Sequence, residues 1–77
     1  MPELTKADLK NNAVANFKYA RTQLKLTVKE MARYLDINEK TLGAIEEGRA
    51  STPHHVYKLS CLINVSMDSI YKTLLNQ

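Results

Sequence analysis

Hydrophobic residues recur along this chain with the three- to four-residue period of α-helices, and no stretch alternates over the length of a β-strand. The first such run predicts a helix whose start has two interpretations. Thr5 followed by Asp8 resembles a capping box, which would place the start there. Asn11 or Asn12 could instead cap the helix and leave residues 1–10 as an arm. The apolar stripe consists of Leu9, Ala13, Phe17, Ala20 and Leu24.

The segment from Thr27 to Gly48 predicts two short helices with a tight turn between them. Thr27 is a favoured N-cap, and Glu30 completes a capping box. Asn38 caps the second helix, and Gly48 suits the left-handed position after its end. This is the layout of a helix-turn-helix, whose second helix normally enters a DNA major groove. The inward residues expected here are Val28, Met31, Ala32, Leu35, Leu42 and Ile45.

Two further helices are predicted in the last third of the chain. Ser51 or Thr52 caps the first of them, with Pro53 at its first position. Residues 64–65 break the pattern, and Ser66 caps the next helix. The chain is therefore expected to be all-α, with five helices and short connections. The inward residues expected here are Val56, Leu59, Leu62, Ile63, Ile70, Leu74 and Met67.

A length of 77 residues fits one domain. We expect residues 1–10 to be an arm or an extension of the first helix, and residues 11–77 to be the domain, with the helix-turn-helix at about 27–48. No apolar run approaches the roughly 18 residues that a membrane span needs. The first ten residues also lack the apolar segment of a secretory signal.

The residue types that carry catalysis or bind metals are sparse. Cys61 is the single cysteine, which excludes an internal disulfide, fits a reducing cytoplasm and is expected to be a buried structural thiol. His54 and His55 are adjacent and would point about 100° apart on a helix, so they are poorly placed to chelate one metal. The four tyrosines are expected to pack at the edge of the core. We expect no enzyme site, no metal and no cofactor.

Charge is distributed unevenly along the chain. The formal net charge is +3, which weakly favours a polyanionic partner. Residues 36–48 nevertheless carry a net charge of −3, so the remainder carries +6. The segment expected to contact DNA bases is thus negatively charged, whereas the rest of the chain is positively charged. Its charged residues are Asp36, Glu39, Glu46, Glu47 and the single base Lys40.

A series of residues runs through the chain in a characteristic order: Arg21, Thr27 with Glu30, Met31-Ala32, Ile37-Asn38, Ile45-Glu46-Glu47-Gly48, Pro53, and Val65-Ser66-Met67-Asp68-Ser69-Ile70. In this order and spacing the chain resembles the lambda-repressor-like helix-turn-helix regulators of the Cro/CI and XRE type. The resemblance covers about residues 16–75, and no single motif in it is specific. It implies a five-helix lambda-repressor-like domain that binds double-stranded DNA as a transcriptional regulator, commonly as a homodimer.

The resemblance also implies roles for individual residues. The matching positions make Arg21 and Glu46 a structural ion pair between the first and third helices. Two positions depart from the family pattern, because Val28 replaces a glutamine that contacts phosphate and Asp36 replaces the glycine of the turn. The base contacts carried over are Glu39, Lys40, Thr41 and Ala44, with Gly43 lacking a side chain. The dimer candidates are Ile70, Tyr71, Leu74 and Leu75. We expect Tyr71 and Leu75 to lie one helical turn apart, beside the Ile70–Leu74 stripe, and to extend an apolar patch.

Exposed bases near the predicted motif are candidates for phosphate contacts, namely Lys29, Arg33 and Arg49, together with Lys40. The alternative function is a protein-interaction module, antitoxin-like or anti-repressor, that keeps the fold without reading DNA. The acidic, side-chain-poor third helix is the feature that keeps this alternative open.

Overall fold

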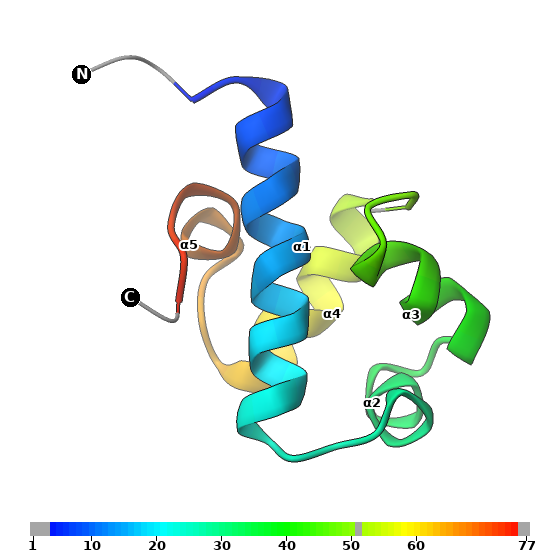
Figure 1. Ribbon diagram of the computed structural model, residues 1–77. Coiled ribbons are helices and arrows are strands. Elements are labelled where there is room, and N and C mark those ends of the chain that lie inside the picture. Colours follow the sequence, from blue (N-terminus) through cyan, green and yellow to red (C-terminus); the bar gives the residue numbers. More distant parts are fainter. Residues whose placement is uncertain (1–3, 51, 76–77) are drawn as a thin grey trace.

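Five helices make up the protein, which we describe from a computed structural model over residues 4–50 and 52–75. None of these residues lies in a β-strand, and none of the helices is long and apolar enough to cross a membrane. The all-α, five-helix expectation is therefore confirmed. In chain order the helices are α1 (Lys6–Gln23), α2 (Val28–Leu35), α3 (Glu39–Glu46), α4 (Pro53–Ile63) and α5 (Met67–Lys72) (Figure 1).

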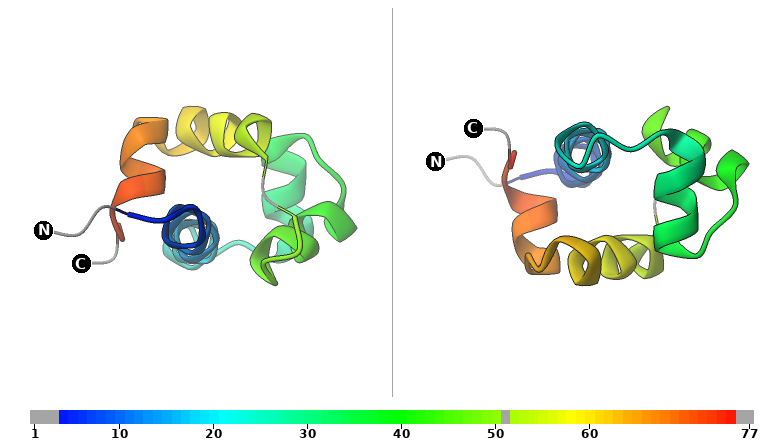
Figure 2. Two further views of the ribbon diagram at one scale, coloured as in Figure 1. Left: turned by 90° about the horizontal axis from the view of Figure 1, so that it is seen from above. Right: turned by 90° about the horizontal axis from the view of Figure 1, so that it is seen from below.

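The longest helix, α1, is the element around which the others are arranged. It packs against α3, α4 and α5, while α2 packs against α3 and α4. Viewed along its axis, α1 has α5 on one side and α3 on another, with α4 joining the two sides (Figure 2). The buried residues of all five helices face the space enclosed in this way.

Side-chain caps begin each helix. The Thr5 hydroxyl accepts the Asp8 N–H at 3.1 Å, and the Asp8 carboxylate accepts the Thr5 N–H at 2.9 Å. This capping box starts α1 at Lys6, so the alternative start at Asn11 or Asn12 is wrong. The remaining N-caps are Thr27, Asn38, Thr52 and Ser66. They agree with the sequence expectations, although Ser51 lies outside the described residues.

A left-handed residue follows each of α1, α2, α3 and α4, whereas α5 is followed by the extended Thr73. Asp36 follows α2 with a φ of 55°, and Asn64 follows α4 with a φ of 56°. Gly48 has a φ of 80° after α3, as expected from its sequence position. Lys25 was not expected to be left-handed, yet it has a φ of 55° after α1. Asp36 therefore adopts the left-handed backbone for which the family pattern has a glycine, and this conformation is less favourable for an aspartate than for a glycine.

The stripe on α1 is partly confirmed. Ala13, Phe17 and Ala20 are buried, whereas Leu24 is 46% exposed and its expected burial is wrong. Leu24 lies beyond the last residue of α1, where the chain turns, and so leaves the buried side. The other buried hydrophobic residues are Met31, Ala32, Leu35, Leu42, Ile45, Val56, Leu59 and Ile70.

A buried amide, Asn16, joins α1 to the end of the chain. Its Nδ2 donates to the carbonyls of Ile70 at 2.7 Å and Thr73 at 2.8 Å. Its Oδ1 accepts the N–H of Leu75 at 2.9 Å. Both ends of this side chain are therefore satisfied by backbone, which explains how an asparagine that is 1% exposed is tolerated in the core.

The segment after α5 is not helical. Because α5 ends at Lys72, the prediction that Tyr71 and Leu75 lie one helical turn apart is wrong, and Leu74 is not on α5 either. The Asn16 side chain takes the backbone groups that would otherwise continue the helix. Nearby, Asn12 Nδ2 donates to the Tyr71 carbonyl at 2.9 Å.

Several side chains expected at the core edge lie on the surface. Cys61 is exposed, so the expected buried thiol is wrong. Tyr34 is 65% exposed and Tyr57 is 55% exposed, whereas Tyr19 and Tyr71 are half-buried. Helical period fixes which side of a helix points inward, but it does not fix how far the neighbouring helix covers the flank of that side.

Candidate nucleic-acid interface

One side of α3 holds the helix against the body of the protein. Leu42 and Ile45 on that side are fully buried, where α3 packs against α1 and α2. The Asn38 side chain accepts the Thr41 N–H at 2.9 Å and fixes the start of the helix. The opposite side of α3 is left facing outward.

The outward side of α3 carries the residues expected to contact bases. At about 100° per residue, Lys40, Gly43 and Ala44 occupy its centre, and Glu39 and Thr41 lie at its two edges. Glu39 and Lys40 are exposed, whereas Thr41 and Ala44 are half-buried. A Cβ atom added at Gly43 would meet no atom within 4 Å. The centre of this side is therefore open and has one long side chain.

Arg21 and Glu46 tie α1 to the end of α3. The Arg21 Nε lies 2.8 Å from Glu46 Oε2, and Nη2 lies 3.0 Å from Oε1, so the contact is bidentate. Arg21 Nη1 also donates to the carbonyl of Leu26 at 3.3 Å. The hydrogen bond that Arg21 donates to Glu46 raises the pKa of Arg21 above its ordinary value, despite an opposing contribution from burial. The pair anchors α3 at its C-terminal end.

Ion pairs also reduce the acidity of the residue 36–48 segment. Glu46 is 8% exposed and is neutralised by Arg21. Glu47 accepts from Arg49, with the Arg49 Nε 2.7 Å from Glu47 Oε2. Two of the four acids in the segment are thus paired, which leaves Glu39 as the acid nearest to the outward side of α3.

The bases expected to contact phosphate have different surroundings. Lys29 and Arg33 on α2 are exposed, and Arg33 lines a shallow pocket with Glu30 and Tyr34. Arg49 is exposed as well, but it already pairs with Glu47. Because exposed ion pairs are weak, a phosphate can compete with that carboxylate for the guanidinium.

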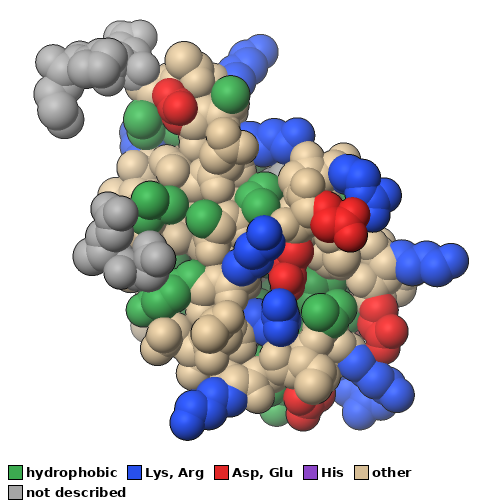
Figure 3. All heavy atoms as spheres, viewed as in Figure 1, with side chains coloured by type: hydrophobic (Ala, Val, Ile, Leu, Met, Phe, Trp, Pro, Cys, Tyr) green, Lys and Arg blue, Asp and Glu red, His purple; other side chains and the backbone are tan. Residues whose placement is uncertain are grey.

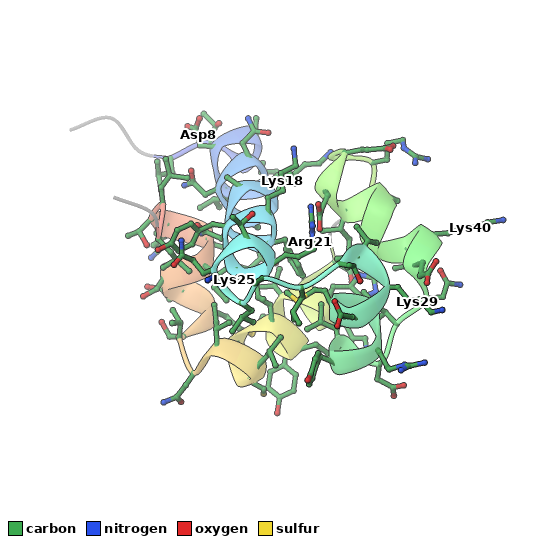
Figure 4. The ribbon with its side chains drawn as sticks, turned by 60° about the horizontal axis from the view of Figure 1, so that its bottom comes forward. Asp8, Lys18, Arg21, Lys25, Lys29 and Lys40 are labelled. Carbon is green, nitrogen blue, oxygen red and sulfur yellow. The ribbon has the colours of Figure 1, made fainter. Side chains whose placement is uncertain are left out.

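Basic side chains gather on the face formed by α1 and α3. Figure 3 shows Lys and Arg side chains over α1 and along the outer side of α3. Figure 4 labels Lys18 and Lys25 on the α1 side, Lys29 on α2 and Lys40 projecting from α3. Lys18 and Lys25 were not singled out from the sequence. The available signal for Lys18 was its spacing of three residues before Arg21, whereas Lys25 lies beyond the end of α1 and has no such helical spacing.

The dimer candidates do not form one exposed patch. Ile70 is fully buried in the core of the single chain, so it is not available to a partner. Tyr71, Leu74 and Leu75 are half-buried. Leu75 also lines a shallow apolar pocket with residues of α1, including Tyr19.

No group of three or more His, Cys, Asp or Glu side chains within residues 4–50 and 52–75 could hold a metal ion. Against known proteins, no curated sequence and no solved structure matches the chain. A family model described as helix-turn-helix does match it over residues 17–70, which is more than half of the chain. That span contains both helices of the motif, the Arg21–Glu46 pair and α4. With this match, the chain belongs to the lambda-repressor-like helix-turn-helix family of DNA-binding regulators.

Proposed function

We propose that the protein binds double-stranded DNA and regulates transcription with α3 in the major groove. The observation that supports this most directly is the orientation of α3. Leu42, Ile45 and the Arg21–Glu46 pair hold one side, and the outward side is open. A helix held in this way can enter a groove without rearrangement of the domain.

In this proposal, Lys40 at the centre of the outward side donates to guanine, and Glu39 at its edge accepts from the N4 amino group of cytosine. Ala44 contacts a thymine methyl, and Thr41 contributes a hydroxyl. Gly43 allows the backbone to approach the base edges closely. With one long cation at the centre, sequence preference should be modest and concentrated on few base pairs.

Phosphate contacts would position the helix. Lys29, Arg33 and Arg49 flank the motif and supply positive charge without reading sequence. A homodimer on two half-sites is the expected arrangement. The half-buried Tyr71, Leu74 and Leu75 are the candidates to join the two copies, and Ile70 is excluded by its burial.

A genomic-library selection with the purified protein, repeated at two salt concentrations, tests this function. An enriched motif that survives the higher salt supports sequence reading by α3. Lys40→Ala should then weaken binding to the enriched site by roughly tenfold and relax specificity at one or two base pairs. Lys72→Ala removes a lysine from α5, which packs on the other side of α1 from α3, and should change neither property (Figure 1). Recovery of no motif, with only weak salt-sensitive binding, would overturn specific readout.

A protein-docking role for α3 is the second candidate. It is favoured by the open space at Gly43 and by the exposed acid Glu39 at the edge of the same side. Gly43→Leu should block the binding of a protein partner, whereas Lys40→Ala should leave any DNA signal unchanged. A loss of DNA binding in the Lys40→Ala variant favours the DNA-binding role of α3 instead.

A further inference from the structure

The cations of α1 lie on one side of that helix. At about 100° per residue, Lys6, Lys10, Lys18 and Arg21 all fall within about 120° of one another. The only acid of α1, Asp8, falls on the opposite side. Such a segregation of charge is not required by the core, because Lys6, Lys10 and Lys18 are all exposed.

Hydrogen bonds identify the side toward which these cations point. Arg21, in the middle of the group, contacts Glu46 on α3. Asn12 and Asn16, about 140° and more around the helix from Arg21, bind the backbone of α5 and of the segment after it. The cations therefore face the α3 side of the molecule, with Lys18 one turn from Arg21 (Figure 4).

Two further lysines lie outside this group. Lys25 follows the end of α1, where its left-handed backbone turns the chain off the helical spacing, and it is exposed. Lys29 lies in the first turn of α2, inside the helix-turn-helix. We therefore give the name basic stripe only to the α1 lysines Lys6, Lys10 and Lys18.

The lysines of the basic stripe are not neutralised by ion pairs. The ion pairs formed among the described residues are Arg21–Glu46, Arg49–Glu47 and Lys72–Asp68, and none includes a stripe lysine. Residues 6–35 contain seven bases and two acids, a net charge of +5, against −3 for residues 36–48. Positive charge is thus concentrated in the segment of α1 and α2 and not in that of α3.

We propose that the basic stripe is a second contact surface for double-stranded DNA, which binds the phosphate backbone along α1. This inference rests on the proposed function and adds to it, because it adds phosphate contacts on α1 to those that flank the helix-turn-helix. Lys10 and Lys18 are eight residues apart, which corresponds to about 12 Å along the helix. That length spans more than one phosphate of a strand, since phosphates advance about 3.4 Å per base pair along the axis.

The test is the salt dependence of binding to a duplex that carries the enriched motif, with the duplex made either about 12 or about 24 base pairs long. Each lost phosphate contact should reduce the slope of log K against log salt by about 0.9. The Lys10→Ala, Lys18→Ala double variant should lower the slope by nearly two and weaken binding several-fold, mainly on the longer duplex. Its preferred base sequence should stay unchanged.

Lys72→Glu is the matched control, since it lowers the net charge by the same two units at an exposed position of α5 and should leave the slope unchanged. Lys18→Arg in the wild-type protein should leave the slope unchanged, because the arginine keeps the charge. Circular dichroism and thermal unfolding of each variant verify the fold, which exposed lysines should not alter.

The possible outcomes distinguish the basic stripe from the proposed DNA readout by α3. An unchanged slope in the double variant, with wild-type binding to the enriched duplex intact, overturns the basic stripe and leaves the proposed function standing. If no motif is enriched, a reduced slope of the double variant on a duplex of arbitrary sequence supports the basic stripe and overturns specific readout by α3. Equal slopes and affinities on single-stranded RNA of matched length overturn the assignment to duplex DNA. Absence of any binding by the wild-type protein overturns both.

Discussion

The two flanks of α1 are joined to their neighbours by different chemistry. On the α5 side, the neutral amide of Asn16 bonds three backbone groups inside the core, at distances of 2.7 to 2.9 Å. On the α3 side, the charged Arg21 bonds Glu46, with the two side chains 27% and 10% exposed. The Asn16 contacts are uncharged and buried, whereas the Arg21–Glu46 pair is ionic and partly exposed to water.

This difference follows from the surroundings of the two contacts, one in the core and one at the surface. A buried amide can be fully satisfied without the large desolvation cost of an ion. An ion pair costs less where water still reaches the arginine, and there it also holds α3 beside the surface where phosphates would bind. We therefore expect the contacts on the α5 side to contribute more to stability, while the α3 side holds the residues of the proposed DNA contacts.

Substitution of Asn16 should give the largest effect. Asn16→Ala leaves two carbonyls and one N–H without partners, and we expect the free energy of unfolding to fall by about 3 kcal/mol or more. The thermal midpoint should fall by more than about 10 °C. Urea denaturation followed by circular dichroism measures the loss. Asn11→Ala, the same change at an exposed position of α1, should cost almost nothing, and similar values for the two variants would contradict the role of Asn16.

Removal of the Arg21–Glu46 ion pair should lower the free energy of unfolding by less than Asn16→Ala does. A double-mutant cycle of Arg21→Ala and Glu46→Ala is expected to give a coupling free energy of about 1–2 kcal/mol, between the values for exposed and buried pairs. The same cycle on the exposed pair Arg49 and Glu47 should give less than about 0.5 kcal/mol. A coupling at Arg21 and Glu46 as large as the loss at Asn16 would remove the distinction between the two flanks.

A stabilising substitution in α3 extends the comparison between the α3 side and the α5 side of α1. Gly43→Ala adds a Cβ into open space within α3 and should raise the free energy of unfolding by about 0.5–1 kcal/mol. Gly48→Ala should do the reverse, because its φ of 80° strains an alanine. Chemical denaturation of both variants checks the signs, and a destabilising Gly43→Ala would show that α3 does not tolerate the extra methyl group.

The smallest effect concerns pH. The Thr27 backbone and hydroxyl lower the pKa of Glu30 below its ordinary value of 4.5. A carboxyl group with a lowered folded pKa stabilises the protein above the ordinary value, and that contribution is lost as the pH falls through the folded value. Glu30→Gln should therefore flatten the thermal midpoint against pH in this acid range. The amides of Asn12 and Asn16 do not titrate, so their removal should leave the shape of the profile unchanged.

Local signals explain why most of the fold could be predicted from the sequence. Thr27 with Glu30, Asn38 and Ser66 each act on backbone within their own first turn, so a window of four residues determines them. Positive φ at Gly48 is equally local. The Arg21–Glu46 contact spans 25 positions and came only from the family resemblance.

Long-range contacts account for the failures. Asn16 bonds residues 54 to 59 positions away, and no periodicity of α1 could indicate this. The same contacts end α5 early, and so the expected Tyr71–Leu75 stripe is absent. Lys18 was overlooked for the opposite reason, because its helical spacing from Arg21 is visible in the sequence but gains meaning only once Arg21 is known to face α3. Lys25 lies beyond the end of α1, so helical spacing could not place it.

The exposed Cys61 has a practical consequence for such experiments. It is the single cysteine of the chain and lies on α4, so one fluorophore can be attached at one defined point without any substitution. The same thiol can link two molecules by air oxidation, which would produce a covalent pair unrelated to operator geometry. Measurements of assembly state therefore require a reductant, and a Cys61→Ser variant separates chemical cross-linking from genuine self-association.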